Sequence, residues 1–545
     1  MYEDLNDAQN NVVELFTREL ALALTKWQDA LGKDAVLSSE TDIARYQNCC
    51  SQSRRHIHAI LLPENEGQIQ DILLIAATHK VPVYPVSTGR NWGFGGANPA
   101  VDNCVIIDLH KMNRIIDFDA DLGIVTVEPG VTQGQLEEFL SANNYPFMYS
   151  AIASSTHCSV MGNALDRGHG MMPHTDRFSS LMSLRAILPD GSVYQPLLDD
   201  AGGKAVSRAY KWGVGPYIDG LFSQGSFGVV TEASFALARR PEHVTLFYFR
   251  PRDGVNMTEF TDKLREVKQR LGGVVNTIDF GNRMSAEQGK RDSDNVLSPE
   301  DLWQRMDDVS LWTAYGSIHA SSEMNKAAIK AMQRILKPVA HDFVFVNGDL
   351  IKKVENKPKK FKNTAMRRFV AQNIGLIKEM YAYMHGKPQM KALNYTYHHQ
   401  NMPEKDDKAL DGDIKQAGLI WYWPIIPLRG KDVHLFLQMF KQISAKHKIY
   451  PTWNLCVESE TWISAGIHIF FDPATEKEAA DKYHKELFEE GKRLGYLPHR
   501  AHIDTMGWYT ETEGSHFFDM VKKLKKGLDP NNIMAPGRYG PAGKL

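Results

Sequence analysis

Cysteine is scarce in this 545-residue sequence: the chain has five, none of them in a C-x-x-C pair or at the spacing of zinc ligands. This pattern argues against a disulfide framework and predicts free thiols in a reducing compartment. The sequence also lacks any run of about 18 apolar residues, and its first residues are acidic and polar. We therefore expect no transmembrane span, no secretory signal and a cytoplasmic location.

An excess of charge of either sign is absent as well. Lysine and arginine number 63 and aspartate and glutamate 65, which gives a formal net charge of −2 at pH 7. This balance argues against nucleic acid or an anionic membrane as a partner, and we interpret the basic run at 357–362 as a solvated surface. His56, His58, His398 and His399 have no carboxylate or cysteine partners at ligand spacing, so no metal site is predicted.

The best-known glycine-rich nucleotide motifs are missing too, since the chain has neither a Walker A loop nor a Rossmann fingerprint. It has instead the stretch 82–99, P-V-Y-P-V-S-T-G-R-N-W-G-F-G-G-A-N-P. Glycine lets a ligand approach the backbone closely, and successive amides in a turn form an anion-binding nest. Ser87, Thr88, Arg90 and Asn91 add further donors. The stretch is either a pyrophosphate-binding loop or a structural turn between strands.

The segments after this stretch favour the first alternative by their order. The patterns predict a strand at 104–109, a turn at 110–115, a strand at 123–132 and an amphipathic helix at 133–140. This order resembles the FAD-binding domain of the vanillyl-alcohol oxidase and para-cresol methylhydroxylase (PCMH) family. Further blocks carry the same resemblance, namely V-M-G-N-A-L-D-R-G-H-G (160–170), 211–231, L-D-P-N-N-I-M-A-P-G-R (528–538) and, more weakly, 423–430.

The resemblance and a change of composition after Arg240 predict the organisation of an α+β protein. We expect an N-terminal helical extension at 1–56, a PCMH-type FAD-binding domain of two subdomains at 57–240, a second α+β domain that caps the substrate site at 241–495, and a C-terminal segment at 496–545 that returns to the FAD domain as loops. The resemblance also implies a homodimer.

Within the second domain the apolar periodicity is clear. It predicts helices over 257–271, 321–337 and 433–447 and strands over 244–251 and 462–471. The charged stretches 351–364 and 398–408 are interpreted as surface loops.

The resemblance implies a set of residues that bind FAD. Arg500, in P-H-R-A-H, and Arg538, in A-P-G-R-Y, supply permanent positive charge that can stabilise an oxyanion or the flavin ring. The implied cofactor-binding residues are Pro85, Ser87, Thr88, Gly89, Arg90, Asn91, Trp92, Gly93, Gly95, Pro129, Ser155, Ser159, Gly162, Asn163, Gly228, Val229, Val230, Arg500 and Arg538.

The substrate side departs from the family pattern. Phe94 and His499 occupy the positions of two tyrosines that bind a phenolate in the family, and Ser154 falls where an acidic residue is expected. Phenylalanine cannot donate a hydrogen bond, whereas histidine can donate one or act as a base near neutral pH. The candidate catalytic residues are therefore His499, Arg500, Arg538, Ser154 and Phe94, and a para-substituted phenol is less expected as the substrate.

The sequence favours non-covalent FAD. Family members attach the flavin through a histidine or tyrosine on a late strand, and that position aligns near Ala465, with His468 on the opposite face of the strand. Cys158 stands where some relatives form a thioether, but those relatives also use a histidine in the first glycine loop, which this loop lacks.

These observations lead to one main hypothesis and two alternatives. The first is an FAD-dependent oxidoreductase that moves a hydride from an alcohol, amine or aromatic substrate to flavin N5, with oxygen or another acceptor reoxidising it. The second is an oxidoreductase that tailors a non-phenolic metabolite in biosynthesis. The third is a catalytically inactive flavin-binding module.

Overall fold

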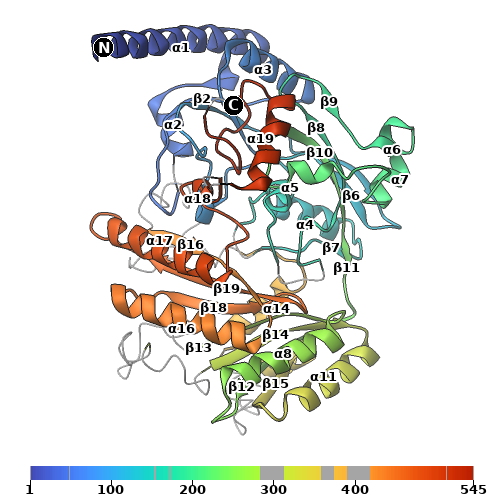
Figure 1. Cartoon of the computed structure of the whole chain (residues 1–545). Helices are drawn as coiled ribbons and strands as arrows, with labels where there is room; N and C mark the ends of the chain where they lie inside the picture. The colour runs from blue at the N-terminus through green and yellow to red at the C-terminus, as the bar shows by residue number, and fades with distance from the viewer. Residues whose placement is uncertain are drawn as a thin grey trace.

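The computed structural model describes residues 2–47, 49–152, 155–170, 174–282, 303, 312–356, 373–389, 418–510, 512 and 514–543. Figure 1 shows these residues in two domains, with both chain ends in the first and a broad sheet flanked by helices in the second. The first domain carries the sheets built from β1 to β10, and the second carries the sheet built from β12 to β19.

Within the described residues, a sheet of four strands in the order β1-β2-β4-β3 opens the first domain. β2, β4 and β3 run parallel, and β1 pairs antiparallel with β2. Every residue of β4 is buried, as expected for a parallel strand covered on both faces. The elements are β1 (Val36–Leu37), β2 (Ile57–Leu61), β3 (Val83–Val86) and β4 (Cys104–Asp108), with α1 (Tyr2–Leu31), α2 (Glu40–Tyr46) and α3 (Glu66–His79).

A second sheet completes the first domain and is antiparallel, in the order β5-β6-β10-β8-β9. Leu136, Leu140, Val160 and Met161 of its helices share one buried cluster with its strands. The elements are β5 (Ile115–Asp119), β6 (Ile124–Val127), β8 (Leu181–Ile187), β9 (Val193–Tyr194), β10 (Val229–Ala236), α4 (Gln133–Ala142), α5 (Val160–Leu165), α6 (Leu197–Asp200) and α7 (Lys204–Ala209), beside the short pair β7 (Phe147–Met148) and β11 (Ala238–Arg239).

The sheet of the second domain is antiparallel, and its described strands follow the order β15-β12-β14-β13-β18-β19-β16, with β17 paired to β19. The strands are β12 (His243–Pro251), β13 (Val275–Asn282), β14 (Trp312–Ala320), β15 (Ala340–Val346), β16 (Leu419–Tyr422), β17 (Ile425–Pro427), β18 (Thr452–Val457) and β19 (Trp462–Phe470). The helices are α8 (Met257–Leu271), α11 (Ser322–Leu336), α12 (Gly348–Asn356), α14 (Ile374–Tyr383), α16 (Gly430–His447) and α17 (Lys477–Leu494).

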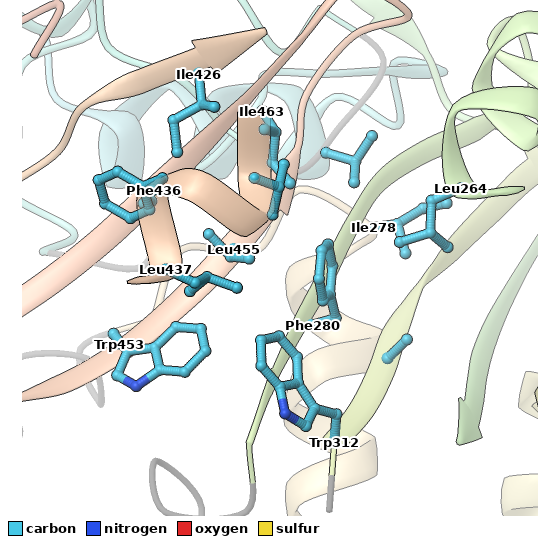
Figure 2. Close-up of a cluster of buried hydrophobic side chains, with 14 of the residues drawn as sticks. Leu264, Ile278, Phe280, Trp312, Ile426, Phe436, Leu437, Trp453, Leu455 and Ile463 are labelled. Atoms are coloured by element: carbon cyan, nitrogen blue, oxygen red, sulfur yellow. The ribbon is translucent and has the colours of Figure 1, made fainter. Parts of the chain in front are cut away.

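The core of this domain lies between the sheet and the helices α8, α11, α16 and α17. Figure 2 shows Phe280, Trp312 and Trp453 gathered in it beside Leu264 of α8 and Phe436 of α16. The rings of Trp312 and Trp453 meet edge to face, 4.9 Å apart at 69°, a geometry worth about 0.5–1.5 kcal/mol beyond burial. Because side chains alternate along a strand, the residues between these core positions on β13 and β18 point to the opposite face of the sheet.

The C-terminal segment returns to the first domain, as the family resemblance implies. Val83 of β3 donates its N–H to Ile533 O at 2.8 Å, and Ala535 donates to Val83 O at 2.8 Å. Before this contact the chain forms α18 (Met506–Thr510) and α19 (His516–Leu528). The tail therefore lies alongside the strand that leads into the glycine-rich stretch.

Several local expectations differ from the structure. The segment 496–545 contains α19, which Ser515 caps by accepting from Phe518 N at 3.4 Å, so it is not made of loops alone. Residues 351–356 belong to α12, where Asn347 Oδ1 accepts from Leu350 N at 3.0 Å and supplies an N-terminal partner. The rest of 351–364, and all of 398–408, lie outside the described residues. The N-terminal segment supplies the edge strand β1 as well as helices.

Membrane-spanning helices, disulfides and metal-binding clusters are absent from the described part of the chain. None of its helices is both long and apolar enough to cross a bilayer. None of the five cysteines, all of which are described, forms a disulfide. No group of three or more histidine, cysteine, aspartate or glutamate side chains among these residues could hold a metal ion.

The tail depends on a buried ion pair, which gives a first prediction. Lys525 is fully buried and donates to Asp529 Oδ2 at 2.8 Å and to Met534 O at 2.7 Å, and Asp529 in turn accepts from Ile533 N and Met534 N, each at 2.9 Å. Lys525→Met leaves the buried carboxylate without its cation, so we expect a loss of about 3–5 kcal/mol of unfolding free energy, measured by urea denaturation.

The matched control is Lys482→Met. Lys482 and Glu478 form an ion pair of the same i,i+4 spacing with 68% and 84% of their side chains exposed, and such pairs contribute about 0–1 kcal/mol. Equal effects of the two substitutions would show that the buried pair does not hold the tail.

Candidate active site

A cavity of about 500 Å³ lies between the two domains. One wall comes from the glycine loop (residues 87–98), α5 and the C-terminal tail. The other comes from β13, β14, β16 and β18 of the second domain. The volume is within the range of cofactor and ligand sites, about 300–1,000 Å³.

The glycine loop packs directly against the C-terminal tail on the same wall. Gly95 has a φ of +119°, and a Cβ there would lie 2.6 Å from the side chain of Ile503. The loop closes on itself because Asn91 O accepts from Phe94 N at 3.0 Å and from Gly96 N at 2.8 Å. The residue at position 95 must therefore be glycine for both its conformation and its contact.

α5 approaches the same loop without an intervening side chain. Ser159 accepts from Gly162 N at 2.9 Å and donates to Pro129 O at 2.6 Å, which fixes the start of the helix. A Cβ on Gly162 would lie 2.9 Å from Ser87 Oγ. The absence of a side chain here lets the helix and the glycine loop pack in direct contact where both line the cavity.

A buried carboxylate organises the polar end of the cavity. Asp166 Oδ2 accepts from Arg500, at 3.0 Å from Nε and also from Nη2, while Oδ1 accepts from Arg538 Nη2 at 2.9 Å. Asn91 donates to Asp166 at 3.1 Å and accepts from Arg500 at 3.0 Å. Burial alone would raise the pKa of Asp166, but the two guanidinium groups hold it below its usual value. Two positive charges and one negative charge leave this end net positive.

Phe94 supports one of these arginines. The Arg500 guanidinium carbon lies 4.2 Å from the centre of the Phe94 ring, a cation–π contact of about 0.5–2 kcal/mol. Phe94 therefore helps to position Arg500, whereas the family resemblance implies a hydrogen-bond-donating tyrosine at position 94.

His499 lines the cavity next to a second histidine. Its ring lies 5.2 Å from that of His169 at 83°, and His169 lies 5.2 Å from Trp462. Burial, together with His169 and Arg500, lowers the pKa of His499 to about 3. Burial similarly lowers the pKa of His169 to about 4. The expectation that His499 titrates near neutral pH therefore differs from the structure, in which desolvation keeps the ring neutral.

The second domain contributes a wall that the sequence did not single out. Thr277, Asp279, Asn454, Cys456 and Glu458 all line the cavity from β13, β18 and the end of β18. The signal available was the alternation of polar and apolar residues in W-N-L-C-V-E (453–458), which puts three polar side chains on one strand face. Asp279 accepts from Asn454 at 3.3 Å and from the Cys456 thiol.

Aromatic side chains of β16 complete that wall. Trp421 and the following Trp423 line the cavity with ring centres 5.7 Å apart. A Cβ on Gly93 would lie 2.9 Å from the Trp421 ring, so the loop rests on this tryptophan.

Most of the sequence-predicted residues meet at the cavity. The predicted residues that line it are Pro85, Ser87, Thr88, Gly89, Arg90, Asn91, Gly93, Phe94, Ser159, Gly162, Asn163, Gly228, Val230, His499, Arg500 and Arg538. Gly95, Pro129, Ser155 and Val229 do not line it. Ser154 lies outside the described residues, as does the side chain of Trp92. Asp166, Tyr84 and His169 line the cavity without having been predicted.

The positions considered for covalent attachment are separated. Ala465 is buried in the core of the second domain and does not line the cavity. His468 packs against Trp421 and Trp423, at 5.5 and 6.0 Å. Cys158 lines the cavity. Non-covalent attachment stays a prediction.

Comparisons with known proteins agree with this geometry. The sequence profile of an FAD binding domain matches residues 57–195. The chain is 29% identical over 541 residues to 1'-carboxy-chondrochloren decarboxylase of Chondromyces crocatus, covering 96% of this chain and 98% of the relative. It is 26% identical over 549 residues to the flavoprotein subunit of 4-cresol dehydrogenase (hydroxylating) of Pseudomonas putida, covering 98% of each.

A solved structure shows the same likeness over the whole chain. The crystal structure of p-cresol methylhydroxylase with substrate bound matches with a TM-score of 0.78 and 25% identity, covering 96% of this chain and 97% of that one. This likeness confirms an FAD-binding domain followed by a second domain. The residues fit FAD, because Gly162 and the glycine loop line the cavity and the Arg500–Asp166–Arg538 group leaves positive charge at it. Over nearly its whole length, the chain thus has an FAD-binding domain and the fold of p-cresol methylhydroxylase, consistent with the p-cresol methylhydroxylase and vanillyl-alcohol oxidase family of FAD-dependent oxidoreductases that its sequence resembles.

Proposed function

We propose that this protein is an enzyme that uses FAD to oxidise a small organic substrate carrying a hydroxyl, an amine or an aromatic ring. When bound, FAD supplies the hydride acceptor, N5 of its ring. The observation that carries the proposal is the group of Arg500, Asp166 and Arg538 at a cavity whose other wall is aromatic and polar.

Arg500 and Arg538 would stabilise negative charge that develops as the substrate is oxidised. Both are fixed before any ligand arrives, since Asp166 binds each of them and Arg538 also donates to Tyr84 OH at 3.2 Å. A preorganised charge needs no reorganisation during the reaction, which is why such groups are effective catalysts.

His499 would accept the substrate's proton. Its Nδ1 is buried and makes no hydrogen bond within the described part of the chain, and its low pKa keeps the ring neutral, as a base must be. Gln224 holds the backbone at this point by donating to His499 O at 2.9 Å. Phe94 would act on the substrate indirectly, through Arg500, and offers no donor to a phenolate oxygen.

A second candidate is the tailoring of a carboxyl-bearing metabolite in biosynthesis. It is favoured by the decarboxylase of Chondromyces crocatus, which aligns over nearly the whole chain. Release of carbon dioxide during anaerobic bleaching of the flavin would distinguish it from oxidation alone. The retained arginines argue against a catalytically inactive flavin-binding module.

The bound cofactor gives a second prediction. Purified protein should be yellow, and acid precipitation should leave the colour in the supernatant, because Ala465 stands at the expected attachment position and the glycine loop has no histidine. The measurement is the visible spectrum of pellet and supernatant. A fluorescent band on a denaturing gel would contradict non-covalent binding and direct peptide mapping to Cys158.

Removal of the fixed charge gives a third prediction. Arg500→Ala should keep FAD, which Arg538 and the backbone still hold, but should slow anaerobic flavin reduction by roughly 10²–10³-fold. Stopped-flow absorbance measures this rate. The control is Arg493→Ala on α17, whose side chain is 66% exposed. An unchanged rate of flavin reduction in Arg500→Ala would show that this arginine does not take part in the reaction.

The fourth prediction concerns pH. Protonation disables a base, and His499 reaches half protonation only near its pKa of about 3. His499 is therefore fully deprotonated at neutral pH and becomes protonated only as the pH falls towards that value. The rate of flavin reduction should then show no decrease due to His499 between about pH 8 and pH 5. His499→Ala should lower the rate by a constant factor across that pH range, because it removes the group that accepts the substrate's proton. An acid limb near pH 6.5 that disappears in His499→Ala would contradict this.

A further inference from the structure

The second-domain wall holds buried acceptor atoms that have no donor. Asp279 and Thr277 are each 2% exposed. Asp279 Oδ2, Thr277 Oγ1 and Glu458 Oε2 are buried and make no hydrogen bond in the described residues, and all three residues line the cavity. Buried polar atoms are nearly always satisfied by protein or ligand, so these point to a group that enters the cavity with donors.

The three residues lie close together on the sheet. Asp279 of β13 pairs in register with Cys456 of β18, and Thr277 precedes Asp279 by two residues on the same strand face. Glu458 follows Cys456 by two residues, and the charge of Asp279 acts on it, raising its pKa. One ligand group can therefore face all three side chains.

Charge gives the sign of that group. Burial raises the pKa of Asp279 to about 6, and burial together with Asp279 raises that of Glu458 to about 8. Because burial opposes their ionisation, a cation that enters beside them would stabilise their charged forms. The charge of Lys268 acts on Glu458 and lowers its pKa, but the Lys268 ammonium donates to the carbonyls of Val275 at 3.2 Å and Asn276 at 3.0 Å. Among the described residues, Asp279 Oδ2 and Glu458 Oε2 accept no hydrogen bond from it.

We propose that the substrate carries a protonated amine, which Asp279, Glu458 and Thr277 bind at the second-domain wall of the cavity. An ammonium has three donors and one positive charge, and here it would meet three unpartnered oxygen atoms, two of them on carboxyl groups whose ionised forms a cation stabilises. This inference rests on the proposed function of the site, and it adds a substrate class that the fold alone does not indicate.

Aromatic rings beside this group strengthen the assignment. A Cβ on Gly466 would lie 2.7 Å from both Asn454 Oδ1 and the Trp423 ring, so Trp423 adjoins the residue that donates to Asp279. Ring faces attract ammonium groups. The cavity thus has a cationic end at Arg500 and an anionic, aromatic wall facing it.

The test uses three ligands of nearly equal shape and different charge: 2-phenylethylamine, 2-phenylethanol and phenylacetate. Their affinities for the purified holoenzyme are measured by isothermal titration calorimetry at neutral pH. We expect the amine to bind at least about 10-fold more tightly than the alcohol, and the anion more weakly than either. Equal affinities, or no binding of the amine, would overturn the proposal.

Isosteric variants locate the effect. Asp279→Asn and Glu458→Gln should each weaken amine binding roughly 10- to 100-fold and leave the alcohol within about threefold, and Thr277→Val should weaken the amine about 2- to 10-fold. The matched control is Asp219→Asn, another buried carboxylate, which binds Tyr194 OH at 2.5 Å and does not line the cavity. An unchanged preference for the amine in all three cavity variants would overturn the assignment.

The readout separates this inference from the proposed function. Calorimetry reports binding whether or not turnover follows. Preference for the amine without flavin reduction by any substrate would support the ammonium site and contradict the oxidase proposal. Flavin reduction without a preference for the amine would support the oxidase proposal and contradict the ammonium site.

Discussion

Asp166 is the residue on which the cavity depends. Its buried carboxylate joins three segments that are far apart in the sequence: the glycine loop through Asn91, and two parts of the tail through Arg500 and Arg538. Removing one partner of such a buried pair costs several kcal/mol because the remaining charge stays desolvated. The carboxylate thus holds the tail, closes the first domain around the cavity and fixes the direction of both guanidinium groups.

The second domain uses one sheet for two purposes. On β13 and β18 the core-facing side chains, among them Phe280 and Trp453 in Figure 2, pack under the helices. The residues between them, Asp279, Asn454 and Cys456, face the cavity. A shift of one residue in strand register would bury the polar set in the core, so the aromatic packing that stabilises this domain also positions the polar wall.

The glycine loop was found because its residue types carry a local signal, and the two arginines because the blocks around them resemble the family. Apolar periodicity placed helices such as α8 (Met257–Leu271) and α11 (Ser322–Leu336) within a residue or two of their ends. Sequence reasoning missed Asp166, although the residue lies within a recognised block, because a single aspartate gives no sign of two arginines more than 300 positions away. It also missed the low pKa of His499, which comes from burial between elements. It expected loops where Ser515 caps α19, since the helix face that packs is marked by Lys525, a residue usually exposed.

The two walls of the cavity together constrain how a substrate lies. The first-domain end is net positive, because one carboxylate balances only one of two guanidinium groups. The wall opposite is rich in acceptors and aromatic rings, and within the described part of the chain Asp279 Oδ2 and Glu458 Oε2 have no hydrogen-bond partner there. Consider a molecule that develops negative charge at one end and carries positive charge at the other. In one orientation both charges are stabilised by the walls they meet. In the reverse orientation each charge meets a wall of its own sign, and the repulsion is strong in a medium of low dielectric. The charges on the two domains therefore set the orientation of the substrate. The shape of the cavity has only to place the reacting carbon between them.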